Sequence, residues 1–165
     1  MNPKNHPFVP IDFSIPEVLE NDHFLIRMLT VNDVVKDYEA VMTSIDRIKG
    51  VFGPDSDWPS VDLTLEQDLI DLGWHQKEFQ RRSSFAYTVM NPDEEQCLGC
   101  VYIYPSNKKD FDVETYLWVR ESAFRERLEP ILYDTVKGWL KKDWPFQSVA
   151  YPGREIIWEE WANIF

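Results

Sequence analysis

The order of apolar segments in the second half of the chain limits the fold more than any other feature of the sequence. Three short runs rich in aromatic and β-branched residues are separated by polar turns, as in neighbouring strands: Phe85–Met90, Cys97–Tyr104 and Asp112–Val119. Apolar residues at helical spacing follow in Ile131–Leu140, directly after Pro130, a residue suited to the first turn of a helix. Three consecutive strands and a helix predict a mostly antiparallel sheet with a helix packed on it.

The remaining segments add two strands and two helices. His23–Leu29 alternates as a strand does, and Phe146–Tyr151 reads as a last short strand. Two helix starts resemble capping boxes, Thr30 with Asp33 and Thr64 with Gln67. The chain therefore predicts an α/β (α+β) fold: a single domain with a mixed, mostly antiparallel sheet of five or six strands flanked by helices.

Proline spacing and aromatic content divide the chain into three parts. Residues 1–21 contain four prolines and predict an extended arm that packs onto the body through apolar residues such as Phe8 and Phe13. Residues 22–154 form the domain itself. Residues 155–165 form a tail with Trp158 and Trp161 that is too apolar to remain free. We expect this tail to cover the last strand or to join a second subunit in a homodimer.

The charge of the chain bears on its partners. Twenty-nine acidic residues oppose 17 basic ones, which leaves a formal net charge of −12. Binding to a phosphate backbone depends on lysine and arginine, so nucleic acid is not expected as a partner. An acidic field favours a cationic substrate such as an amine, although acidity also serves simply to keep a protein soluble.

The sequence gives no support for a membrane-spanning protein, a secreted protein or a metal-binding protein. No apolar run approaches the roughly 18–20 residues that cross a membrane, and no secretory signal is visible, so we expect a cytoplasmic protein without membrane contact. Cys97 and Cys100 form a C-x-x-C pair, but residues three apart in a regular strand point to opposite faces. We therefore expect two buried thiols and no metal site.

Two segments resemble the GNAT N-acetyltransferase superfamily. His23–Asp33 is similar to its opening strand and helix start, with an apolar run, an arginine, an apolar pair, a threonine and a nearby aspartate. Leu98–Tyr104 is similar to its central strand, with an early glycine. The order of predicted elements matches the superfamily core over residues 22–154. The resemblance implies an enzyme that transfers an acetyl group from acetyl-CoA to an amine.

The resemblance also implies where acetyl-CoA would bind. In the superfamily, the strand corresponding to Leu117, Trp118 and Val119 parts from its neighbour, here beyond Leu117, and its free backbone groups pair with the pantetheine arm. The next loop has the form Q/R-x-x-G-x-G/A and holds the pyrophosphate. Here Arg127 and Glu129 stand at the glycine positions, and the loop contains no glycine. Side chains are then the expected phosphate ligands: Arg120, Arg125 and Arg127. The alternative is a solvated loop of mixed charge.

Two residues are candidates for acid–base catalysis by the same resemblance. Alternation places Glu114 on one face of its strand with Tyr116 and Trp118, and superfamily members often carry a carboxylate near this point. Glu114 is therefore the candidate base, or else an ordinary ion-paired side chain. Tyr151, after the last strand, is the candidate acid, or else a packed aromatic. His75 is a weaker alternative base.

Two hypotheses of function follow. The first is an N-acyltransferase acting on an unidentified small-molecule or peptide amine, for which the parting strand and Glu114 argue. The second is a GNAT-like domain that has lost CoA binding and serves as a binding or interaction module. Arg127 and Glu129 at the glycine positions favour the second.

Overall fold

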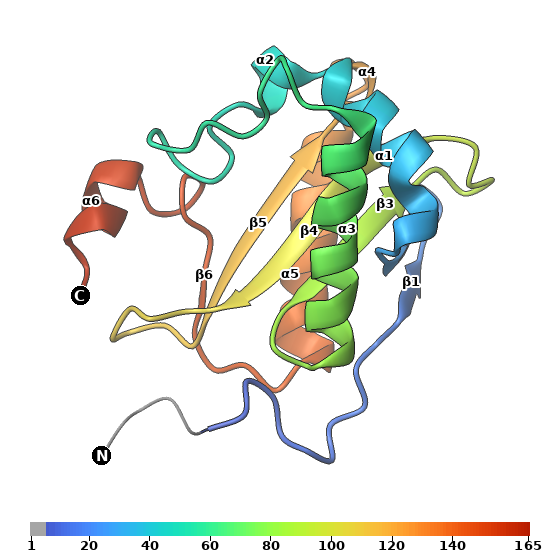
Figure 1. Ribbon diagram of the computed structural model, residues 1–165. Helices are drawn as coiled ribbons and strands as arrows, with labels where there is room; N and C mark the ends of the chain where they lie inside the picture. The colour runs from blue at the N-terminus through green and yellow to red at the C-terminus, as the bar shows by residue number, and fades with distance from the viewer. Residues whose placement is uncertain (1–5) are drawn as a thin grey trace.

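Six strands form one continuous sheet in the computed structural model, which describes residues 6–165 (Figure 1). The strands lie in the order of the chain: β1 Val18–Glu20, β2 Leu25–Met28, β3 Phe85–Met90, β4 Cys97–Pro105, β5 Val113–Val119 and β6 Val149–Ala150. Neighbours are antiparallel except β5 and β6, which are parallel. The predicted fold class, with a mixed and mostly antiparallel sheet, is confirmed.

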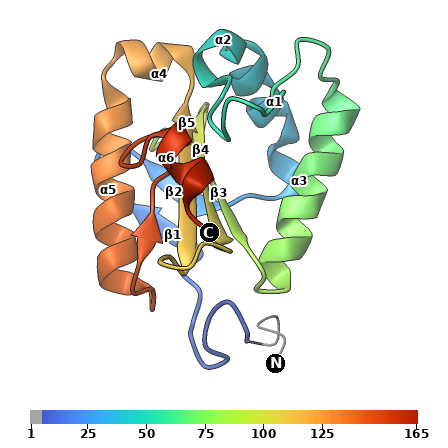
Figure 2. The same ribbon diagram turned by 90° about the vertical axis from the view of Figure 1, so that its left-hand side faces the viewer.

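Helices cover both faces of this sheet. They are the 3-10 turn η2 Val31–Asp33, α1 Val34–Met42, α2 Ile45–Ile48, α3 Leu65–Gln80, α4 Glu121–Arg125, α5 Leu128–Asp143 and α6 Trp158–Asn163. Figure 2 shows α5 on one face and α1, α2 and α3 on the other. Two buried clusters follow from this arrangement, one under α5 and one under α1 and α3. No helix in residues 6–165 is both long and apolar enough to cross a membrane.

The helix starts follow from local sequence. Thr30 with Asp33, and Thr64 with Gln67, form capping boxes in which side chains satisfy backbone amides that lack a partner within the helix. The short helix α4 was not predicted, because the polar sequence before α5 reads as a loop. The third long helix, α5, begins at Leu128, which places Pro130 in its first turn.

A bulge in β4 changes the expected position of the cysteines. Met90 pairs with Cys97 while Val89 pairs with Gly99, so Leu98 is an extra residue in the strand. This insertion shifts the alternation of side chains, and Cys97 and Cys100 pack in the same cluster under α1 and α3. The prediction that they point to opposite faces is wrong for this reason. Both thiols are free and buried.

Both ends of the described chain pack on the domain. In the N-terminal arm, Val9 is buried and Phe8 stacks between Phe85 and Phe146. At the other end α6 lies over the β5–β6 end of the sheet (Figures 1 and 2). The indole of Trp158 stacks on Tyr116 with a centroid distance of 6.4 Å, and Trp161 is buried. A homodimer through this tail stays a prediction.

Candidate functional site

The parallel pair β5–β6 opens into a fork. Only two residue pairs join the strands, Val113 with Val149 and Glu114 with Ala150. Beyond them β5 continues to Val119 alongside β4 alone. The strands therefore separate after Glu114, earlier than the expected point beyond Leu117.

One edge of β5 thus presents backbone groups to the fork. Arg120 N donates to Leu98 O at 2.7 Å, toward β4. Leu117 O faces the other way, where it accepts a hydrogen bond from Arg154 Nη2 at 3.0 Å. The side chains of Leu117 and Val119 pack under α5, and Trp118 packs on the opposite face. An extended molecule entering the fork would meet this edge as an added strand would.

In the loop between β5 and α5, one residue that is not glycine has a backbone conformation that favours glycine. Arg127 is the N-cap of α5 and lies in the left-handed region at φ 62° and ψ 33°. This region favours glycine, because a Cβ makes it costly for other residues. The unusual conformation occurs at the position where the superfamily pattern has its first glycine.

Glu129, at the second glycine position, occupies the end of the fork. Its carboxylate accepts hydrogen bonds from Arg47 Nη2 at 2.5 Å and Arg154 Nη2 at 2.8 Å. Burial alone would raise the pKa of Glu129, but the hydrogen bonds from the two guanidinium groups outweigh it and lower the pKa. An ionised carboxylate therefore sits in the first turn of α5, where the helix dipole favours an anion.

The three arginines expected to contact phosphate do not converge. Arg120 is buried and forms a bidentate pair with Glu39, at 2.6 and 2.7 Å. Arg125 is exposed and pairs with Glu121 at 3.1 Å, and Arg127 is exposed. The two arginines that do converge on the start of α5 are Arg47 and Arg154, which sequence reasoning missed. They lie in different elements, and neither belongs to a motif that marks it.

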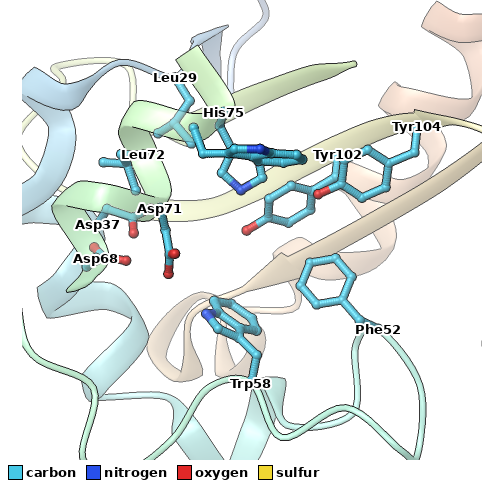
Figure 3. A pocket seen from close by; sticks show the side chains of 11 residues that line it. Leu29, Asp37, Phe52, Trp58, Asp68, Asp71, Leu72, His75, Tyr102 and Tyr104 are labelled. Carbon is cyan, nitrogen blue, oxygen red and sulfur yellow. The ribbon is translucent and has the colours of Figure 1, made fainter. Parts of the chain in front are cut away.

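A pocket of about 280 Å³ lies between α1, α3 and β4 (Figure 3). Three carboxyl groups, those of Asp37, Asp68 and Asp71, gather at one end in Figure 3. Aromatic rings form most of the remaining wall: Phe52, Trp58, Tyr102 and Tyr104. Four further residues complete the lining: Leu29, Leu72, Trp74 and His75. Sequence reasoning missed these carboxylates as a site.

The carboxyl groups of this pocket lack basic partners, and one of their buried oxygens lacks a hydrogen bond. Asp68 is 2% exposed, and its Oδ2 atom has no hydrogen-bond partner. Burial, and secondly the neighbouring Asp68, raises the pKa of Asp37 well above its ordinary value. Burial also raises the pKa of Asp71, at the rim. Within residues 6–165, no ion pair links any of the three to a basic side chain.

His75 is a neutral member of the same wall. Burial lowers its pKa to about 4, and its Nδ1 atom is buried without a partner. The imidazole packs 5.4 Å from the Tyr102 ring and 5.1 Å from the Trp74 ring, measured between centroids. At neutral pH it adds a polar group to the pocket and no positive charge.

Glu114 and Tyr151 flank the base of the fork on opposite faces of the sheet. Glu114 is on the pocket side, where it accepts a hydrogen bond from the Tyr116 hydroxyl at 3.1 Å and pairs across the strands with Tyr104. Tyr151 is buried on the α5 side, with its ring edge-on to Tyr133 at 5.4 Å. Burial raises the pKa of Tyr151, so its hydroxyl keeps its proton.

Comparison with known proteins identifies the fold. The sequence matches no protein-family model and no curated protein. Among solved structures, it is similar to a ribosomal-protein-S5-alanine acetyltransferase from Vibrio fischeri, with 14% identity and a TM-score of 0.59 over 76% of this chain and 67% of that one. It is also similar to RimL, a ribosomal L7/L12 α-N-protein acetyltransferase in complex with coenzyme A. The identity is 14% and the TM-score 0.59, over 77% of this chain and 70% of that one.

A third similar structure is the microcin C7 self-immunity acetyltransferase MccE in complex with acetyl-CoA and AMP. The identity is 11% and the TM-score 0.60, over 78% of this chain and 67% of that one. At these identities the likeness concerns the fold. The six-stranded, mostly antiparallel sheet and its flanking helices are those of the GNAT acetyltransferase fold.

Proposed function

We propose that the protein is an N-acyltransferase that moves an acetyl group from acetyl-CoA to an amine. The observation that carries this proposal is the fork, because beyond Glu114 this edge of β5 pairs with no strand, apart from the Arg154 contact to Leu117 O, and can take a pantetheine arm. Structures of this fold that hold coenzyme A or acetyl-CoA support the choice of donor. Neighbours named for acetylating a ribosomal protein or spermidine support the choice of an amine acceptor.

The reaction needs a base, an acid and polarisation of the thioester carbonyl. The neutral amine nitrogen attacks the carbonyl carbon, a C–N bond forms, the C–S bond breaks, and the thiolate leaves. Glu114 takes the proton that the nitrogen loses, directly or through one water, from the pocket side of the sheet. Tyr151, which retains its proton, protonates the thiolate from the α5 side. Backbone amides of the free β5 edge, at Leu117–Val119, polarise the carbonyl.

The start of α5 is the proposed place for the pyrophosphate. Arg47 and Arg154 converge there, and Arg125 at the end of α4 and Arg127 at the N-cap of α5 are exposed. The diphosphate would replace the Glu129 carboxylate between the two converging guanidinium groups. Arg120 would support the end of β5 through its pair with Glu39.

A second candidate function is a GNAT-like binding module without CoA. The observation that favours it is Glu129, a negative charge of the chain's own at the position of the pyrophosphate. Such a module would keep the fold and the pocket of carboxylates and would use them for recognition alone.

Acetyl-CoA binding separates the two candidates. A ligand at 100 times its dissociation constant stabilises a protein by about 2.7 kcal/mol, which a thermal-shift assay readily detects. We expect a rise in Tm with millimolar acetyl-CoA and none with free acetate. No rise would end the transferase proposal and leave the binding module.

A variant tests the proposed base separately. Glu114→Gln should lower acetyl transfer to a diamine roughly 10²- to 10³-fold while leaving the acetyl-CoA dissociation constant unchanged. Glu160→Gln, an exposed position on α6, is the matched control. Equal activity of both variants would remove Glu114 from the mechanism.

A further inference from the structure

The pocket between α1 and α3 gathers three carboxyl groups that pair with no basic side chain of residues 6–165. Its carboxyl groups come from two helices, Asp37 from α1 and Asp68 and Asp71 from α3. The guanidinium of Arg27, which pairs with the neighbouring Asp33, is engaged by Asp33 at 2.7 Å and Glu94 at 2.6 Å. The three pocket carboxyls thus have no cation of their own within residues 6–165.

Asp68 carries the strongest sign of a missing partner. A buried carboxylate oxygen normally has a hydrogen bond or an ion pair, because leaving it unsatisfied is costly. Asp68 Oδ2 is buried, lines the pocket and has neither. A cationic donor in the pocket would supply both the charge and the hydrogen bond.

A proton shared between Asp37 and Asp68 supplies only part of the missing hydrogen bonding and none of the missing positive charge. The raised pKa of Asp37, caused first by burial and then by Asp68, keeps a proton on Asp37. That proton can serve one hydrogen bond from Asp37 to Asp68. Burial raises the pKa of Asp68 as well, so its ionised form lacks a compensating cation, and burial does the same to the pKa of Asp71.

The rest of the wall indicates what kind of cation fits. The rings of Phe52, Trp58, Tyr102 and Tyr104 offer π-faces and apolar area, which suit an alkylammonium ion. A metal ion needs several ligands around one point, and the described residues contain no cluster of three or more histidine, cysteine or carboxylate ligands placed to hold one.

We infer that this pocket binds a primary alkylammonium ion, with its nitrogen between Asp68 and Asp71 and its alkyl chain against the aromatic wall. Binding of the ammonium ion does not depend on acetyl-CoA. Its role as the acyl acceptor rests on the proposed function.

The position of the pocket explains why a diamine suits it best. A protonated nitrogen bound to carboxylates has no lone pair for attack on a thioester, so the reacting nitrogen must be a second one. Phe52 lines the pocket and also contacts Tyr116 of β5 at 5.3 Å between centroids. Tyr104 lines the pocket and pairs across the strands with Glu114. A diamine anchored by one end therefore directs its other end toward the proposed base.

Calorimetric titration of the full chain with 1,4-diaminobutane, without acetyl-CoA, tests the inference. We expect saturable binding of the diamine and none of 1,4-butanediol, which has the same length and no charge. Asp68→Asn removes the charge at nearly constant shape and should weaken binding at least tenfold. Glu66→Gln, an exposed position on the same helix, should leave it unchanged.

A second variant covers the case in which Asp68→Asn does not fold. Asp71→Asn changes an exposed rim position and should also weaken diamine binding several-fold. Absence of diamine binding to the wild type, or equal binding by all the carboxamide variants, would overturn the inference. If acetyl-CoA binds and the diamine does not, the inference fails while the proposed function stands. If the diamine binds and acetyl-CoA does not, the inference stands while the proposed function fails.

Discussion

The Glu129 carboxylate bridges to the Arg154 guanidinium at 2.8 Å across the open end of the fork, while its other oxygen holds Arg47. The same arginine donates to Leu117 O, so one side chain joins the start of α5 to the free edge of β5. This network occupies the place where an anionic donor would bind. Under the proposed function, the charge at position 129 opposes binding of the anionic acetyl-CoA.

Glu129→Gln should strengthen acetyl-CoA binding roughly tenfold. The substitution removes a negative charge beside the proposed pyrophosphate position and frees Arg47 and Arg154 to contact phosphate, a gain of about 1.4 kcal/mol. Loss of two ion pairs should lower the free energy of unfolding by about 1 kcal/mol. Titration calorimetry measures the first effect and urea denaturation the second.

The control for this change is Glu126→Gln, which removes the same charge from an exposed position of the loop. It should alter acetyl-CoA affinity by less than about twofold, since exposed charges are screened by solvent and salt. Unchanged or weaker binding by Glu129→Gln would show that the pyrophosphate does not lie at the start of α5.

Arg127→Gly should leave the protein as stable as before or more stable, by up to about 1 kcal/mol. Glycine relieves the left-handed strain at φ 62°, and the larger entropy of the unfolded glycine chain offsets part of this gain. Arg125→Gly, at the last residue of α4, should instead lower stability, by up to about 1 kcal/mol. Urea denaturation of both variants makes the comparison, and equal losses would contradict the left-handed conformation at Arg127.

Arg120→Met should lower the free energy of unfolding by about 1–2 kcal/mol. The variant keeps much of the buried stem but loses the bidentate pair with Glu39, which ties the end of β5 to α1. Glu39 is half exposed and regains water, which limits the loss. Arg125→Met, whose side chain is 76% exposed, is the control and should change stability by less than about 0.5 kcal/mol.

Asp37→Asn should flatten the dependence of stability on pH above about pH 5, where an unfolded aspartate, with its ordinary pKa of 3.8, is ionised. The folded state raises the pKa of Asp37, so it binds a proton that the unfolded chain releases, and the stability of the wild type falls as pH rises through the folded pKa. Asparagine resembles the protonated acid and removes that loss, so the variant should gain stability relative to the wild type as pH rises.

Thermal denaturation across this pH range checks the prediction. The groups facing Asp37 are Asp33 on η2, Asp68 and Asp71 on α3, and Cys97, Cys100 and Tyr102 on β4. Asp62→Asn, an exposed carboxylate, serves as the control and should retain the slope of the wild type. Parallel profiles for wild type and Asp37→Asn would contradict the buried ionisation. Glu129, whose pKa is lowered, loses its stabilising charge only below about pH 4.5 and lies outside this window.

Much of the fold could be predicted because its signals are local. Capping boxes at Thr30 and Thr64 mark helix starts, and alternation marks the central strands. The bulge at Leu98 has no such signal, because it depends on the register between β3 and β4. That one extra residue is why both cysteines lie on the same face.

The candidate site was less predictable because its residues meet only through tertiary structure. Nothing in the spacing of Arg47, Glu129 and Arg154 indicates that they form one network. The carboxylate pocket, in contrast, has a local signal in the sequence. Asp68 lies one turn before the buried Leu72 on α3, and Asp37 lies one turn before the buried Val41 on α1. A carboxylate within the buried stripe of a helix is a usable signal for a polar pocket.

The aromatic layer of Trp58 and Trp118, with ring centroids 6.2 Å apart, separates two regions of opposite polarity. Arg47 and Arg154 lie with Trp118 on one side of it, and Asp68 and Asp71 lie with Trp58 on the other. A polyanionic nucleotide and an alkylammonium ion would each be repelled from the other's compartment. Under the proposed function and the inferred ammonium site, either reactant could therefore bind first, because neither competes for the other's place.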